Sequence, residues 1–486
     1  MSLPSRVPFT PAPPRCSLFL PRLRLLFAIL AASLVGCAAY PEKGRRARAA
    51  NETGDYEIVA GLAGAAAEDD AKDALVWKLE QGAALRALGR LPASVQAFED
   101  VERRLRTEEE APDFSVAESG ASLLVNDGTA PYRARPYDRI YASTYQALNR
   151  LELGQFEAAR VSLTRLRFVQ EVFGNGAIYR APKPVEGAEK YDADRALRDE
   201  RTRADLARIT DDLAVLGADG TYDDAFSHWL QGMFFLRLGQ GGADLEKARK
   251  ELLAATALNR ASTVFARDLA DCEAAQAGRP APARVVYVLV EAGLGPAWRE
   301  ERIDIPLFVA GGHVPYVSVA LPALSPVPSD VQLALRLDGR PVAVESASRP
   351  SALVAKHFEA ALPDIRTRAF TSAAVKATAS YLINRAAAQR ANRQDSGAGA
   401  GLLALVTQVG TAAYTVVSTR ADLRHWTGLP GRFSLLRLEA PAGARLEVSG
   451  HPEAALTLPA GKVLLVSLKV ASENSPVVVR CTPLVP

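Results

Sequence analysis

One pattern occurs three times in the chain and limits its fold more than any other feature. In each copy a glutamine and a small residue are followed, seven positions after the glutamine, by a leucine and a glycine. The copies are Gln81, Gly82, Leu88 and Gly89; Gln146, Ala147, Leu153 and Gly154; and Gln231, Gly232, Leu238 and Gly239. Beyond each glycine, apolar residues recur three and four positions apart, as on one face of a helix. The pattern predicts three two-helix hairpins, each with a glycine at the end of its first helix.

These hairpins resemble the tetratricopeptide repeat (TPR), in which a small residue of the first helix lets the second helix approach closely. The copies are spaced more widely than the about 34 residues of that repeat, and extra segments at residues 107–136 and 171–221 separate them. The spacing argues against a regular solenoid and favours separate TPR-like hairpins within residues 55–277. Generic amphipathic hairpins that share the pattern by chance are the alternative.

Where such repeats stack, their first helices line a concave groove that commonly receives a peptide or a helix. By this resemblance, five apolar or aromatic residues belong to the groove: Tyr141, Leu148, Phe226, Trp229 and Met233. A groove of this chemistry suits a partner protein. The alternative, which helical spacing favours, is that inserted segments such as residues 193–216 cover these side chains and make them core.

The residue pattern changes from helical to β-rich at residues 278–282, which form a short linker that contains prolines. A chain of 486 residues with 48% hydrophobic and 23% charged residues is typical of a soluble protein with more than one domain. Residues 283–486 are β-rich, and Asp338-Gly339 marks a hairpin turn between apolar runs. The expected fold is therefore α+β and multidomain, with a sandwich-like second domain.

A helical insertion at about residues 351–420 interrupts the expected strands, with a break or kink near Pro363. Within it, residues 402–418 are apolar and alanine-rich. They are shorter than the about 20 residues that span a bilayer as a helix, and packing on a sheet is the expectation.

The N-terminus, residues 1–36, resembles a lipoprotein signal peptide. Two arginines precede an apolar run at residues 25–34, which is too short to be a transmembrane helix. The run ends in Leu-Val-Gly-Cys at residues 34–37, which resembles the bacterial lipobox. The resemblance implies that Cys37 becomes the acylated first residue of the mature chain, and several acyl chains would hold it on a membrane permanently. An ordinary secretory leader with a chance cysteine is the alternative.

Ala38 stands where a signal for retention in the inner membrane typically has aspartate, so lipoprotein sorting implies the periplasmic face of the outer membrane in a Gram-negative envelope. Residues 37–54, with Pro41, Gly44 and several basic residues, are expected to form a tether between the lipid and the first fold. The formal net charge is +3, and loss of the four arginines of the leader leaves −1. This balance gives no nucleic-acid-binding footprint.

Cys272 and Cys481 would be the cysteines left in an oxidising compartment after cleavage and acylation. A disulfide between them and two unpaired thiols are equally open. Two distant cysteines are not expected to form a metal site.

Two sequence blocks carry a more specific resemblance. Block 1, residues 291–306, contains Gly293, Gly295, Pro296 and Asp304, and block 2, residues 421–430, contains Asp422, Arg424 and Trp426. With the lipobox and the repeats, they are similar to blocks of an uncharacterised family of bacterial TPR-containing outer-membrane lipoproteins. That family offers no established active site. The resemblance implies an envelope role, with factors of peptidoglycan synthesis as candidate partners.

The search for catalytic motifs supports no enzyme class. Residues 293–296 hold half of a dinucleotide fingerprint, and Pro296 removes an N–H that a phosphate cradle would use. The histidines show no metal-ligand spacing. Asp422 lies near His425 without a nucleophile motif, and core roles are favoured: Arg424 pairs with an acid such as Asp422, and Trp426 fills the core.

The sequence thus predicts a lipid-anchored scaffold for another envelope protein, without enzymatic activity or cofactor. A peptidoglycan- or polysaccharide-acting enzyme is the alternative, with catalytic residues from Asp304 or from Asp422 and His425. A component of an export machine is the third hypothesis.

Overall fold

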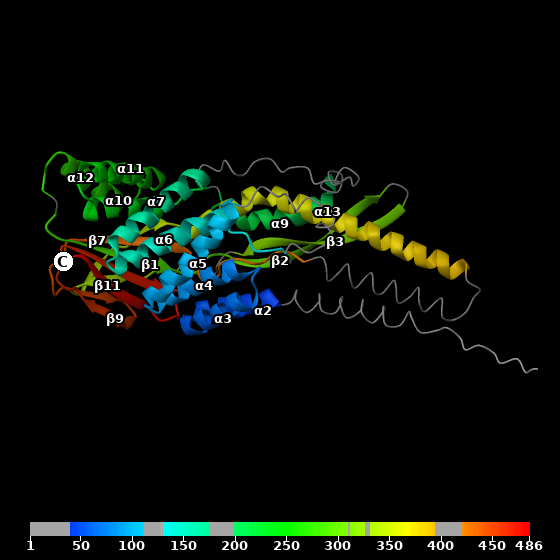
Figure 1. The fold of residues 1–486 in the computed structure, drawn as a ribbon, viewed down its shortest axis with the longest axis horizontal. Coiled ribbons are helices and arrows are strands. Elements are labelled where there is room, and N and C mark those ends of the chain that lie inside the picture. The colour runs from blue at the N-terminus through cyan, green and yellow to red at the C-terminus, as the bar shows by residue number, and fades with distance from the viewer. Residues whose placement is uncertain are drawn as a thin grey trace, which may run out of the picture.

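The computed structural model describes residues 39–110, 128, 130–174, 198–218, 220–280, 282–309, 312–325, 331–393 and 420–486, without the side chains of 39, 110, 306–309, 312–316 and 374–393. The predicted signal peptide, Cys37 and the apolar residues 402–418 lie outside the described residues. The architecture mixes helices and sheets, so the predicted α+β class is confirmed (Figure 1).

The N-terminal half is helical. Its helices are α2 (Ala39–Thr53), α3 (Tyr56–Asp69), α4 (Ala74–Ala87), α5 (Leu91–Glu110), α6 (Pro136–Glu152), α7 (Phe156–Phe173), α9 (Glu200–Leu216), α10 (Ala225–Leu238), α11 (Gly242–Leu258) and α12 (Thr263–Gln276). The pairs α4–α5, α6–α7 and α10–α11 lie where the repeated pattern predicts helix pairs. Gly89 and Gly154 follow α4 and α6 with φ of +72° and +70°, whereas Gly239 after α10 is extended.

Helix α2 corrects the predicted tether at residues 37–54. Tyr40, Ala47 and Ala50 fall on one face of this helix and are buried. Basic residues between these positions hide the apolar stripe in the sequence. Residues 39–53 are therefore a packed helix, which begins two residues after the predicted lipidation site.

Two of the three sheets among the described residues form the body of the C-terminal half. The larger has the order β11-β10-β1-β7-β6, with β1 (Val285–Ala292), β6 (Glu345–Ser348), β7 (Arg432–Leu438), β10 (Val463–Val470) and β11 (Val478–Val485). The smaller has the order β5-β4-β8-β9, with β4 (Leu335–Leu337), β5 (Arg340–Val342), β8 (Arg445–Val448) and β9 (His451–Thr457). Asp338 and Gly339, with φ of 47° and 76°, form the predicted turn between β4 and β5.

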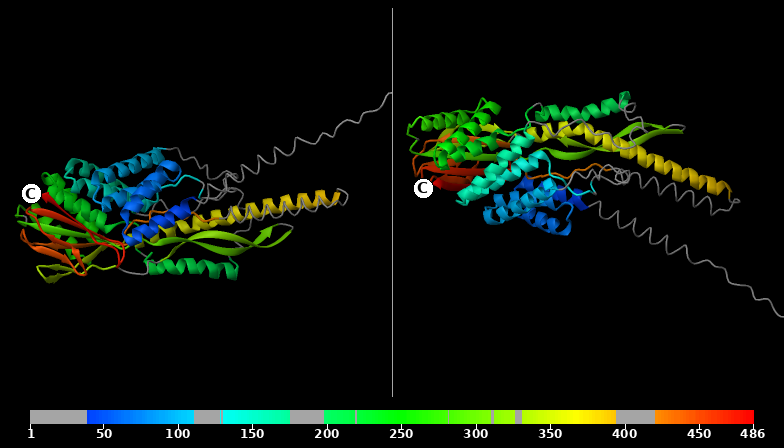
Figure 2. Two further views of the ribbon diagram at one scale, coloured as in Figure 1. Left: turned by 90° about the horizontal axis from the view of Figure 1, so that it is seen from below. Right: turned by 45° about the horizontal axis from the view of Figure 1, so that its top comes forward.

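The larger sheet is the middle layer of the body. Alternate residues of β1 point to opposite faces: Tyr287 and Leu289 belong to the core under the helices, and Val286 and Val288 to the core under the smaller sheet. Figure 2 shows the helices against one face of the strands. One apolar core thus joins both halves of the chain, and residues 278–282 separate them in sequence only.

The predicted partner groove is filled by this sheet. Tyr141, Leu148, Phe226, Trp229 and Met233 are all fully buried, which corrects their assignment to a partner-binding surface. Phe433 of β7 stacks on Phe226 with 4.4 Å between ring centroids and lies 5.9 Å from the ring of Tyr141.

The described part of the segment at residues 193–216 is helix α9, which packs against α13 and the strands at residues 297–325 and does not supply the cover that the alternative expected. Asp212 of α9 instead accepts a hydrogen bond of 2.7 Å from Arg299 in strand β2 (Ala297–Val309). The cover is the sheet of the chain's own C-terminal half.

An arm projects from the body. It consists of the two-stranded hairpin β2 (Ala297–Val309) and β3 (Gly312–Ser325), flanked by α9 and by α13 (Pro350–Arg393) (Figure 1). Helix α13 continues through Pro363, where the sequence suggested a break or kink. Among the described residues, none of the helices combines the length and apolar character that crossing a membrane requires.

Both described cysteines are free, so the disulfide alternative is wrong. Cys272 on α12 is buried in the core under the helices, whereas Cys481 on β11 packs against the core between the sheets. The middle sheet separates these two environments.

The close approach of paired helices is testable at Gly232. An alanine Cβ there would lie 2.5 Å from Cγ of Leu252 in α11. We expect Gly232→Ala to lower the free energy of unfolding by about 1–3 kcal/mol, since the core must shift to accept the methyl group. Urea denaturation at constant slope measures the change.

Gly61 in α3 is the matched control. Nothing lies within 4 Å of a Cβ built there. Gly61→Ala should raise the free energy of unfolding by about 0.5–1 kcal/mol, because alanine loses less entropy in a helix. Equal effects at both glycines would contradict the packing described for α10 and α11.

Candidate functional site

The two sequence blocks meet at helix α2. The turn of block 1 follows β1, with Gly293 at φ +67°. The Gly295 N–H donates to Leu429 O of block 2 at 2.7 Å, and Arg48 of α2 donates to Gly295 O at 2.8 Å. Segments far apart in the sequence are thus hydrogen-bonded into one junction, which we call the anchor junction.

Arg424 of block 2 holds the anchor junction to helix α4. Its side chain is 5% exposed and donates to Asp422 at 2.7 and 2.8 Å, to Asp73 at 2.7 Å, and to Ala130 O at 2.7 Å. The expected Arg424–Asp422 pair is therefore confirmed. Burial raises the pKa of Asp422, but the hydrogen bonds and charge of Arg424 outweigh burial and leave that pKa below its usual value. Asp422 is an ion-pair partner rather than a proton donor.

His425 is sealed in the anchor junction. The Tyr40 hydroxyl donates to the backbone carbonyl of His425 at 3.0 Å, and the backbone N–H of His425 donates to the Tyr40 hydroxyl oxygen at 3.1 Å. The imidazole stacks on Trp298, with 5.7 Å between ring centroids. Burial lowers the pKa of His425 to about 3, so the ring is neutral.

The residues proposed for catalysis do not converge on one cleft. Trp426 is 3% exposed and packs near the rings of Phe98 and Tyr145, so block 2 contributes to the core as expected. Asp304 is half exposed on the arm, where its carboxylate approaches Arg201 at 3.9 Å. Asp422 is engaged by Arg424 in the anchor junction.

A buried carboxylate that the sequence analysis missed completes the anchor junction. Glu80 of α4 is 1% exposed and accepts hydrogen bonds from the N–H groups of Thr427 and Gly428. Asn51 of α2 donates to Glu80 at 3.4 Å and to the Thr427 hydroxyl at 3.0 Å. Burial raises the pKa of Glu80 to about 7, although these hydrogen bonds pull it down. Its signal in the sequence is an acid on a helix face whose neighbouring positions, Val76, Trp77, Ala83 and Ala84, are all apolar.

Five further charges, which we call the central charge cluster, lie between the helices and the middle sheet. Its members are Arg86 (α4), Glu152 (α6), Glu291 (β1), Lys469 (β10) and Arg480 (β11). Arg86 contacts Glu152 at 2.5 Å and Glu291 at 3.6 Å, and Arg480 contacts Glu152 at 2.8 Å. Lys469 lies 3.3 Å from Glu291.

These contacts determine the protonation states of Glu152 and Glu291. Burial raises the pKa of Glu152, but Arg86 and Arg480 outweigh burial and lower it to about 2. Both glutamates are therefore charged at neutral pH, since Lys469 and Arg86 likewise outweigh burial at Glu291 and lower its pKa.

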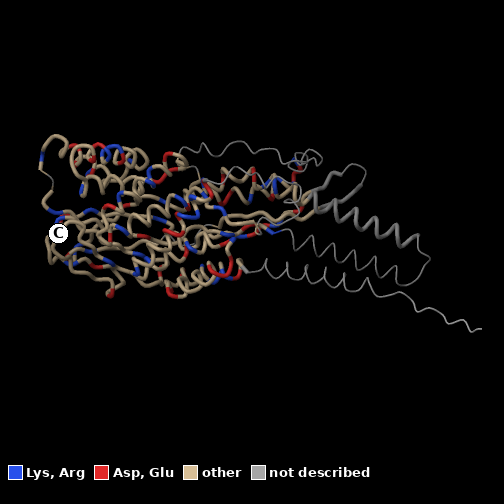
Figure 3. Tube along the Cα trace, in the orientation of Figure 1, with Lys and Arg blue, Asp and Glu red and all other residues tan. Residues whose placement is uncertain are grey.

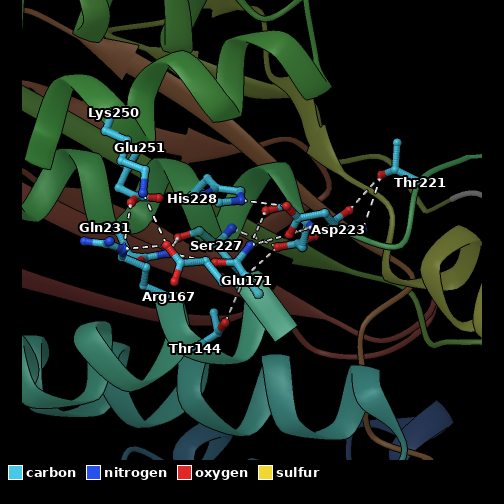
Figure 4. Close-up of polar contacts among 12 residues, drawn as sticks. Thr144, Arg167, Glu171, Thr221, Asp223, Ser227, His228, Gln231, Lys250 and Glu251 are labelled. Atoms are coloured by element: carbon cyan, nitrogen blue, oxygen red, sulfur yellow. Dashed lines mark hydrogen bonds and ion pairs between the residues drawn. The ribbon is translucent and has the colours of Figure 1, made fainter. Parts of the chain in front are cut away.

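A third polar cluster surrounds His228 of α10 (Figure 4). Its ring Nδ1 lies 2.7 Å from Glu251 of α11, and its Nε2 lies 2.8 Å from Asp223. Arg167 of α7 extends the cluster, 3.8 Å from Glu251 and 3.1 Å from Glu171. Because carboxylates occupy both ring nitrogens, His228 joins α10 to α11 as an imidazolium and offers no free nitrogen to a substrate.

The described residues contain no cluster of three or more His, Cys, Asp or Glu side chains placed to hold a metal. A cavity of about 390 Å³ lies on the face of the middle sheet away from the helices, lined by Val290, Ala292, Val331–Ala334, Val344, Ser346, Arg432 and Ser434. None of the residues of the anchor junction lines it. The hydrogen bonds of Tyr40, Arg48 and Asn51 fix α2 in the anchor junction.

No protein-family model, curated protein or solved structure matches the chain.

The His228 cluster makes stability depend on pH. Burial lowers the pKa of His228, but the hydrogen bonds to Asp223 and Glu251 prevail and raise it to about 9. A raised pKa stabilises the fold fully below about pH 6.5, and the contribution is lost as pH rises to about 9. We expect the stability difference between wild type and His228→Gln to shrink by about 3 kcal/mol over this range.

Denaturant titrations at several pH values measure that difference. Lys250→Gln is the matched control, because Lys250 belongs to the same cluster with 59% of its side chain exposed. Its pH profile should run parallel to that of wild type. A difference between wild type and His228→Gln that stays constant with pH would show that His228 is not held as a cation.

Proposed function

We propose that the protein is a lipid-anchored lipoprotein on the periplasmic face of a bacterial outer membrane, where it acts as a non-catalytic scaffold for another envelope component. The position of α2 is the main observation that supports this proposal. This helix begins two residues after Cys37 of the lipobox, and both sequence blocks contact it.

The anchor junction supports a body that is held close to the bilayer rather than connected to it by a flexible tether. Two residues reach at most about 7 Å in an extended chain. Acyl chains on Cys37 would then hold the membrane next to the first turn of α2. A scaffold benefits from this arrangement because it presents its surfaces at a fixed height above the bilayer.

The helix pairs are consistent with the TPR class in one respect. Gly82 and Gly232 stand where the neighbouring helix is closest, with 2.7 Å and 2.5 Å left for a Cβ against Phe98 and Leu252. The groove that such repeats offer to partners is occupied by Phe433 and its sheet. We therefore place the partner on the arm instead of the groove.

The arm has features of a contact surface. Its hairpin is a two-stranded sheet, and outer edges of strands are templates for pairing with another chain. Val215 on α9 is 70% exposed, the largest fraction among the exposed large apolar residues that the structure describes. Envelope proteins, including factors of peptidoglycan synthesis, are the candidate partners.

Metabolic labelling with a clickable fatty acid tests the anchor. The wild type should carry the label and stay with membranes, and Cys37→Ser should lose both because the acylated thiol is gone. Cys481→Ser is the control and should keep the label. A soluble, unlabelled wild type would overturn the proposal.

Cross-linking in the same cells tests the scaffold role. Val215→Glu on the arm should remove an envelope protein that wild type captures, whereas Val161→Glu should retain it. Val161 is 66% exposed on α7 of the body and is therefore a matched control. Equal capture by both variants would remove the arm from the proposal.

A further inference from the structure

The anchor and the arm leave the body at the same place. Tyr40, in the first turn of α2, is hydrogen-bonded to the backbone of His425, whose ring stacks on Trp298. Trp298 is the second residue of β2, where the arm begins. Glu300, two residues further along β2, accepts a hydrogen bond from the Ala421 N–H at 2.9 Å. These contacts fix the base of the arm beside the start of α2.

The arm then extends past the start of α2. Figures 1 and 2 show the hairpin and α13 running beyond α2, away from the end of the body that carries the C-terminus. Ala373 is buried, and the helix continues for twenty residues to Arg393. Those residues add about 30 Å of helix.

This geometry restricts where a bilayer can lie. If acyl chains fix the membrane next to residue 39, a bilayer perpendicular to the arm would have to contain it. The hairpin carries Arg299, Glu300, Glu301, Arg302 and Asp304, which hydrocarbon does not accept without large cost. The described part of α13 also lacks the apolar character of a membrane span. The membrane plane must therefore run alongside the arm.

The charge of α13 suits that position. Figure 3 shows both signs interleaved over the described body. The sequence of residues 365–393 differs, since it contains Arg366, Arg368, Lys376, Arg385, Arg390 and Arg393 and no acid. Each base near an anionic bilayer surface adds attraction that salt screens.

We infer that the arm lies along the bilayer surface and binds anionic phospholipid headgroups through α13, in addition to the N-terminal lipid. The inference rests on the proposed lipid anchor. It makes the bilayer a second partner of the arm. The buried residues of α13 belong to the core on the helix side of the middle sheet, and the smaller sheet covers the opposite face, so the smaller sheet is farther from the headgroups than α13.

Energy transfer from single fluorophores to acceptor-labelled lipids tests the orientation. The lipidated protein is reconstituted in vesicles of phosphatidylcholine with phosphatidylglycerol, after Cys272→Ser and Cys481→Ser. A donor is placed by Ser318→Cys on the arm or by Glu453→Cys on β9, both exposed positions. We expect strong transfer from position 318 and its loss at position 453. Equal transfer from both positions would overturn the inference.

A second experiment tests whether binding requires the positive charges of α13. Replacing Arg385, Arg390 and Arg393 together by Gln should reduce transfer from position 318, and so should vesicles of phosphatidylcholine alone. Replacing Arg103, Arg104 and Arg106 of α5 in the body is the matched control and should leave transfer unchanged. Energy transfer from position 318 that changes neither with lipid charge nor with loss of the α13 arginines would contradict headgroup binding.

The two proposals fail separately. A wild type that does not float with the vesicles contradicts the lipid anchor itself. A protein that floats but shows no transfer at position 318 keeps its anchor and loses only the orientation.

Discussion

The central charge cluster is the constraint on which the rest of the structure depends. Transfer of an ion from water into a protein interior costs several kcal/mol even after relaxation, and only close, well-oriented partners offset this cost. Arg86 finds its partners in Glu152 of another helix and Glu291 of the middle sheet. The helices therefore have one favourable position on the sheet, the one that pairs these charges.

That docking determines what the surfaces can do. With the sheet in place, Phe433 fills the space in front of Phe226 and Tyr141, and this side of the helices is covered. The docking of the helices on the sheet also places block 2 over α4, where Glu80 accepts hydrogen bonds from the N–H groups of Thr427 and Gly428. The anchor junction and the base of the arm are consequences of the same layer contact.

Local patterns in the sequence predicted local structure. The Gln-small pattern placed the helix pairs, and Asp338-Gly339 placed a hairpin, because spacing and turn chemistry act within a few residues. The Arg424–Asp422 pair followed from neighbours in the chain. The tether prediction failed since basic residues mask the stripe formed by Tyr40 and Ala47. What covers Trp229, and which charges meet Arg86, depend on residues far away in sequence, and no local pattern encodes them.

The most direct test of the account is hydrogen exchange measured on Arg86→Met beside wild type. Loss of Arg86 leaves Glu152 and Glu291 short of a buried partner, a change that costs about 3–5 kcal/mol. The account predicts that amides of α10 in the helical half and of β10 in the sheet lose protection together and by the same amount. Loss of protection confined to α4 and α6, with β10 unchanged, would show that the two halves are independent and contradict the account.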